Sequence, residues 1–101
     1  MELVIITAVE AFNKEIKQIL KDSGVMSFSQ MDVAGYKDLS NQPNDENWFG
    51  STNGEHRSVL FYAFVEQKYT EGILKKVAAL NSLQETASYV HAAVLEIKKS
   101  I

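Results

Sequence analysis

Two apolar runs constrain the fold of this chain more than any other feature. Residues 3–9 read LVIITAV, and residues 58–65 read SVLFYAFV. Runs rich in β-branched and aromatic residues favour strands, and in both runs the two alternating sides are apolar. A strand of this kind has to be covered on both faces of its sheet. We therefore expect a sheet that is buried on its two faces.

Helical periodicity follows each of these runs. After the first run, apolar residues recur at helical spacing, and Gly24 stands where a left-handed residue would end a helix. After the second run, another apolar stripe predicts a second helix, which we expect to begin at Thr70 or just before it because threonine is a common N-cap. The apolar positions of the two predicted helices are Phe12, Ile16, Ile19 and Leu20, then Ile73, Leu74, Val77 and Leu80.

Two further stretches are predicted to be strands. Residues 25–36 mix Val, Met, Phe and Ser with no helical period, and Gly35 and Tyr36 close the stretch. Residues 88–97 alternate as a strand does, although their apolar residues also fit one side of a helix. We interpret residues 88–97 as a strand.

The predicted order is strand, helix, strand, strand, helix and strand, with a long connection in the middle. Two split βαβ units of this kind give a ferredoxin-like βαββαβ fold of the α+β class, a four-stranded antiparallel sheet with both helices on one face. A chain of 101 residues has room for one modest core, so the other apolar face needs cover from a second copy. We therefore expect a single domain, residues 1–101, that forms a homo-oligomer.

The long central connection, residues 37–57, is the main candidate for function. It is rich in Asn, Asp, Ser, Gly and other turn formers. Connections longer than about 15 residues are uncommon inside compact domains and usually carry function. Trp48 and Phe49 are large aromatics in this polar stretch, and they either pin the loop to the body or contact a partner or ligand.

Composition excludes several kinds of partner and chemistry. The net charge is only −3 and the basic residues are dispersed, so we expect no nucleic-acid binding. The absence of cysteine rules out thiol chemistry. No apolar run reaches the length of a membrane span and no signal peptide is recognisable, so we expect a cytoplasmic protein without membrane insertion. No nucleophile with a base, paired carboxylates or nucleotide fingerprint is present, so we expect no enzyme.

The stretch from residue 24 to residue 36, GVMSFSQMDVAGY, resembles the second strand of the PII signal-transduction superfamily, which includes the CutA divalent-ion-tolerance proteins. That strand follows a glycine, ends in acidic-Val-x-Gly-aromatic and opens into the T-loop. The order of elements and the chain length are similar too. The resemblance implies a homotrimer with its sheets packed inside, which binds a small effector at the clefts between subunits. It also implies signalling to a protein partner through a T-loop at residues 37–57, as in nitrogen regulation.

This resemblance places the candidate ligand site at the entrance of the loop. It implies that Asp32, Gly35 and Tyr36 line the site and that Trp48 contacts the effector or a protein partner. An alternative for Gly35 is that it only permits the backbone to turn into the loop.

Two departures from the PII pattern restrict the effector. Members that bind ATP carry a Gly-rich, basic turn before the last strand, whereas residues 80–86 here read LNSLQET. A phosphate cradle needs close backbone approach and positive charge, so we expect no ATP binding in the PII manner. Residues 37–57 also contain no tyrosine, so the tyrosine modification of some PII proteins has no acceptor there.

A divalent metal is the alternative effector. His56 and Glu55, with Asp45 and Glu46 earlier in the loop, could supply imidazole and carboxylate ligands where three subunits meet. The same charges also suit a loop that is merely solvated, and no HxH or HxxxH spacing is present. His91 lies in an apolar run, and we interpret it as a buried or interface histidine.

Overall fold

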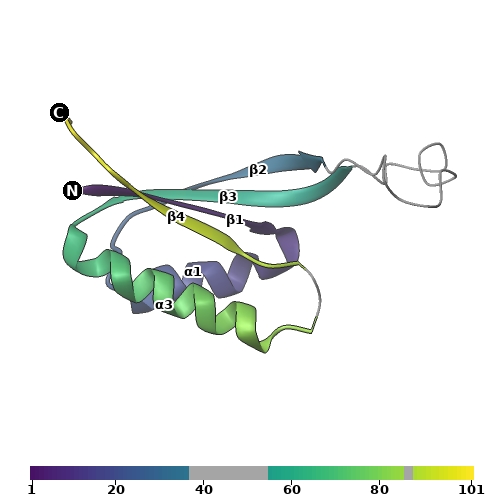
Figure 1. Cartoon of the computed structure of the whole chain (residues 1–101). Helices are drawn as coiled ribbons and strands as arrows, with labels where there is room; N and C mark the ends of the chain where they lie inside the picture. Colours follow the sequence, from purple (N-terminus) through teal and green to yellow (C-terminus); the bar gives the residue numbers. More distant parts are fainter. Residues whose placement is uncertain (37–54, 86–87) are drawn as a thin grey trace, which may run out of the picture.

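Four strands form one antiparallel sheet with two helices on one face, as Figure 1 shows. The computed structural model describes residues 1–36, 55–85 and 88–101. In the sheet the strand order is β2-β3-β1-β4. This is the ferredoxin-like α+β plan expected from the sequence, and its elements are β1 (Glu2–Val9), the 3-10 helix η1 (Glu10–Phe12), α1 (Asn13–Asp22), β2 (Ser29–Tyr36), β3 (Glu55–Val65), α3 (Gln67–Leu83) and β4 (His91–Glu96).

The core lies between the sheet and the two helices. Val4 and Ile6 of β1, Phe61 of β3, Ile16 of α1 and Ile73 of α3 each expose 1% of their surface or less. Alternation along β1 and β3 puts one side of each strand into this core, as the apolar runs predicted.

The end of α1 follows the sequence prediction. Gly24 has a φ of +87°, the left-handed conformation that glycine adopts without strain. The backbone N–H of Gly24 donates to the carbonyl of Lys21, and that of Val25 donates to the carbonyl of Leu20. These bonds satisfy carbonyls at the end of the helix and turn the chain toward β2.

The second strand starts later than the sequence predicted. Residues 25–28 were expected to belong to it, but β2 begins at Ser29, which pairs with Tyr62. Val25 and Phe28 instead pack against the core from an irregular segment, and the Phe28 ring lies 5.8 Å from the Phe61 ring. Their apolar character therefore reflects core packing outside the strand.

The third strand starts earlier than predicted, so the expected loop, residues 37–57, is too long by three residues. β3 begins at Glu55, which pairs with Tyr36. Inter-strand pairing with the end of β2 holds these residues in the sheet despite their polar side chains.

The second helix also starts earlier than expected. α3 begins at Gln67, after Glu66 in an extended conformation, and Thr70 lies in its first turn. The Thr70 hydroxyl donates to the carbonyl of Gln67 at 2.9 Å and lies 2.9 Å from Oε1 of Glu2. Beside it, Tyr69 and then Glu66 raise the pKa of Lys68 above its ordinary value of 10.5.

Residues 91–96 are a strand, which confirms the choice of strand over helix for this region. Asn81 near the end of α3 connects to it: its amide Nδ2 donates to the carbonyl of Val90 at 2.8 Å. Its Oδ1 accepts from the Val90 N–H at 2.7 Å. The side chain thus mimics a strand partner for the residue just before β4.

The sheet face away from the helices carries large apolar side chains, and we call it the open face. Strand pairing puts Leu3 opposite both Phe64 and Leu95, and Ile5 opposite Tyr62. Phe64 is 60% exposed, and its ring meets the Tyr62 ring edge to face at 6.2 Å. Both faces of β1 and β3 are therefore apolar, as predicted, and none of the described helices lies on the open face. None of the helices described is long and apolar enough to span a membrane.

Candidate functional site

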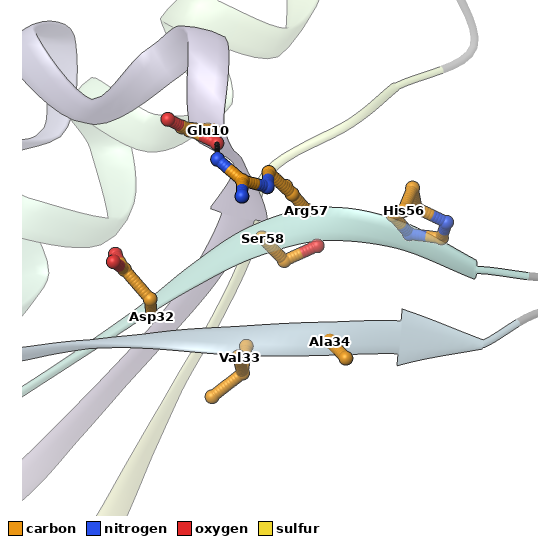
Figure 2. A pocket seen from close by; sticks show the side chains of 7 residues that line it. All are labelled: Glu10, Asp32, Val33, Ala34, His56, Arg57 and Ser58. Carbon is orange, nitrogen blue, oxygen red and sulfur yellow. Dashed lines mark ion pairs between the residues drawn. The ribbon is translucent and has the colours of Figure 1, made fainter.

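A pocket lies where η1 meets the end of β2 and the start of β3. Its volume is about 270 Å³. The pocket lies beside the end of β2 and the start of β3, the two strands that residues 37–54 connect in the sequence. Figure 2 shows the side chains that line it, which are Glu10, Asp32, Val33, Ala34, His56, Arg57 and Ser58.

The positive charge of the pocket is Arg57. A guanidinium nitrogen of Arg57 lies 3.9 Å from Oε2 of Glu10, and the two side chains are 89% and 56% exposed. An exposed pair at this distance contributes about 0–1 kcal/mol. Among the residues described, this long ion pair is the contact of the guanidinium, so most of its five N–H groups are available to a ligand.

Asp32 adds a second carboxylate. It pairs across the strands with Val59, and Arg57 pairs with Ala34, so both side chains leave the sheet on the helix side. Figure 2 shows Asp32, Arg57 and Glu10 on the same side of the two strands. One guanidinium and two carboxylates can together bind a ligand that carries an anionic group and hydrogen-bond donors.

Gly35 lies inside the sheet and leaves room for His56. It pairs with His56 across the strands, and a Cβ on Gly35 would lie 2.7 Å from Nε2 of His56 and 3.1 Å from Oγ of Ser58. Among the residues described, Gly24 is the glycine with positive φ, so Gly35 has ordinary strand geometry. Its lack of a side chain is explained by the close approach of the imidazole.

Two other predicted site residues, Tyr36 and Glu55, lie just beyond this pocket, where they pair at the facing ends of β2 and β3. Tyr36 is the last residue of β2 and is 75% exposed. Glu55 opens β3 beside the exposed His56. Trp48 lies outside the described residues. Within residues 1–36, 55–85 and 88–101, no group of three or more acidic or histidine side chains could hold a metal ion, so the His56 and Glu55 metal site stays a prediction.

Sequence reasoning missed Glu10, Arg57 and Ser58. Arg57 was assigned to the loop, and Glu10 lies far from it in the chain. Because Glu10 and Arg57 are far apart in the chain, no local sequence pattern indicates that they form an ion pair. The extension of β3 to Glu55 brings Arg57 to the pocket.

Comparisons with known proteins identify the fold. No model of a known protein family matches the chain, and no curated protein matches its sequence. Among solved structures, it is similar to CPII, a nitrogen regulatory PII-like protein from Thiomonas intermedia K12, bound to ADP, AMP and bicarbonate. The TM-score is 0.63, the sequence identity 12%, and the match covers 99% of this chain and 94% of CPII. The chain therefore has the fold of PII-like proteins.

Proposed function

We propose that this chain is a PII-like regulatory protein. It assembles as a homotrimer, binds a small effector in clefts between subunits, and signals to a partner through residues 37–57. The observation that carries the proposal is the pocket at the base of that segment, in a chain whose fold matches CPII over nearly its whole length. An effector held there touches the strand ends from which the segment departs, and so it can favour one state of the segment over another.

The open face supports assembly. Its large apolar side chains include Leu60, Tyr62 and Phe64 of β3, all on the side away from the helices. Contiguous apolar surface of this kind on a soluble domain is typical of an interface. A trimer that packs three such faces together removes them from water.

The charges of the pocket define the class of effector. Arg57 suits a carboxylate, bicarbonate or phosphate group, whereas Asp32 and Glu10 suit hydroxyl or amino donors on the same molecule. AMP, ADP and bicarbonate are suitable probes because CPII was solved with them. ATP tests the separate expectation that residues 80–86 make no phosphate cradle.

Calorimetry on the full chain tests this site. We expect at least one of AMP, ADP and bicarbonate to bind, and Arg57→Ala to weaken that binding about tenfold or more, since a hydrogen bond to a charged group contributes about 1.5–3 kcal/mol. Lys75→Ala is the matched control, because Lys75 also forms an exposed ion pair, with Glu71 on α3, far from the pocket. Equal affinity of the Arg57 variant and the wild type would refute the site, and no binding of any probe would refute this effector class.

Trp48 offers a direct readout of signalling. It is the single tryptophan of the chain and lies in the proposed signalling segment. We expect the probe to change tryptophan emission as it saturates the wild type, and we expect Arg57→Ala to need about tenfold more probe, or more, for the same change. Binding without any change in emission would contradict the coupling between site and segment.

The alternative function is divalent-metal binding of the CutA type. It is favoured by the exposed imidazole of His56, which lies over Gly35. We expect calorimetry with copper, zinc and nickel to decide between the two. Metal binding that His56→Ala abolishes would favour this alternative, and binding that this variant leaves unchanged would remove the site.

A further inference from the structure

The guanidinium of Arg57 is flanked by a carboxylate on each side of its strand. β3, which carries Arg57, is paired with β1 on one side and with β2 on the other. On the β1 side, Glu10 directly follows the strand, and its Oε2 lies 3.9 Å from a guanidinium nitrogen. On the β2 side, Asp32 pairs with Val59, two residues from Arg57 along β3. The register of three strands thus brings one cation and two carboxylates to a single pocket.

Asp32 is the diagonal neighbour of Arg57 across the two strands. Arg57 pairs with Ala34, and Asp32 lies two residues before Ala34 on the same side of β2. Diagonal neighbours in an antiparallel pair lie about 7–8 Å apart. Figure 2 shows the guanidinium directed at Glu10, with Asp32 on the same side of the strands. A small molecule can therefore contact the guanidinium with one end and the Asp32 carboxylate with the other.

The size of the pocket restricts the ligand further. Its volume is about 270 Å³. Pockets that hold drug-sized ligands measure about 300–1,000 Å³. This pocket therefore suits a molecule of few atoms, in which the groups that meet the charged side chains are separated by only a few bonds.

We infer that the ligand of this pocket is a small amino acid, whose carboxylate binds Arg57 and whose ammonium group binds Asp32. The inference rests on the effector site proposed above and names the class of its ligand. A guanidinium and a carboxylate form bidentate, charge-assisted hydrogen bonds that are stronger than neutral ones. An ammonium group carries three donors, which match the acceptor oxygens of Asp32.

The charge of Asp32 selects an ammonium group over other substituents of the ligand. A ligand in the pocket displaces water from this carboxylate, and a carboxylate that loses water needs a charged partner. A hydroxyl group brings no charge, and a second anionic group meets a like charge, which costs affinity. A carboxylic acid without an ammonium group should therefore bind more weakly than the amino acid of the same length.

Calorimetry on the full chain at pH 7.5 tests the inference with pairs of probes that differ only by the ammonium group. α-Alanine and β-alanine are each compared with propionate, and γ-aminobutyrate is compared with butyrate. We expect at least one amino acid to bind about tenfold more tightly, or more, than its matched acid, because a hydrogen bond to a charged group changes affinity by at least that factor.

Asp32→Asn removes the charge and keeps the shape of the side chain. We expect this variant to lose the preference for the amino acid over the matched acid, with circular dichroism to confirm its fold. Asp22→Asn is the matched control, because Asp22 is the last residue of α1 and lies at the opposite end of that helix from η1. The control should keep the preference of the wild type.

The outcomes separate the inference from the proposed function. Amino acids that bind no more tightly than their matched acids, or do not bind, would overturn the inference, whereas Arg57-dependent binding of AMP, ADP or bicarbonate would still support the proposed site. A preference that survives in Asp32→Asn would also overturn the inference alone. Amino-acid binding that Arg57→Ala leaves unchanged would overturn the proposed site and the inference together.

Discussion

The glycines of this chain differ in what occupies the space where a Cβ would lie. Gly24 leaves room for the Tyr69 ring, whose Cε1 would lie 3.1 Å from a Cβ at that position. Gly35 leaves room for the His56 ring in the same way, but from within a strand. Gly72 in α3 differs, since a Cβ there would have Lys76 Nζ as its nearest neighbour, at 3.9 Å.

These differences predict opposite effects of the same substitution. Gly24→Ala forces a side chain into left-handed backbone and against Tyr69, so we expect the free energy of unfolding to fall by about 1–2 kcal/mol. Gly72→Ala, the matched control, adds a good helix former in open space, and we expect a gain of about 0.5–1 kcal/mol. Urea denaturation measures both, and equal effects of the two variants would contradict the geometry at Gly24.

The sequence predicted Gly24 but not the role of Gly35. Gly24 follows a recognisable helix, and a helix end has a local glycine signal. The neighbour that occupies the space beside Gly35 is His56, which lies opposite it through the register of β2 on β3. Arg57 was missed for the same reason, since its contact with Glu10 depends on where β3 begins.

At the scale of elements, apolar pattern predicted the four strands and two helices, whereas pairing decided their ends. The runs of β1 and β3 were recognised as strands covered on both faces because apolar residues occupy both alternating sides of each run. Residues 55–57 are polar and still belong to β3, because β2 offers them backbone partners. Residues 25–28 are apolar except for Ser27 and still lie outside β2, where Val25 and Phe28 pack on the core.

The Asn81 side chain supports the connection from α3 to β4. Asn81 pairs with both backbone groups of Val90, which is 4% exposed. Asn81→Ala would leave those groups unsatisfied, so we expect thermal or urea unfolding to show a loss of about 1–3 kcal/mol. Ser82→Ala is the control, because its hydroxyl makes an exposed bond to Ala79, and we expect a change within about 0.5 kcal/mol. A neutral Asn81→Ala would contradict the role of this amide.

At the scale of the whole molecule, the two faces of the sheet have different roles. One face holds the helices, Asp32 and Arg57, and the other carries the large apolar side chains of the described strands. The proposed trimer uses both faces. It buries the open face, and it brings the pockets of neighbouring subunits near one another. Neither the effector nor the partner is encoded in a local motif, so both depend on experiment.

A charge on the open face should prevent assembly without unfolding the subunit. Leu60→Glu places a carboxylate among apolar neighbours of the proposed interface, where burial without a partner is costly. We expect this variant to be a folded monomer by light scattering and circular dichroism. Ala78→Glu introduces the same charge on the exposed surface of α3 and should leave the mass unchanged. A trimeric Leu60→Glu variant would show that the open face is not the interface.

The mass of the wild-type protein in solution is the most direct test of the account. Light scattering at micromolar concentration and pH 7.5 should give three times the 11.3 kDa of one chain. That result would support a trimer assembled as we propose. A mass of one chain under the same conditions would contradict the trimer, and with it the clefts in which the effector is proposed to bind.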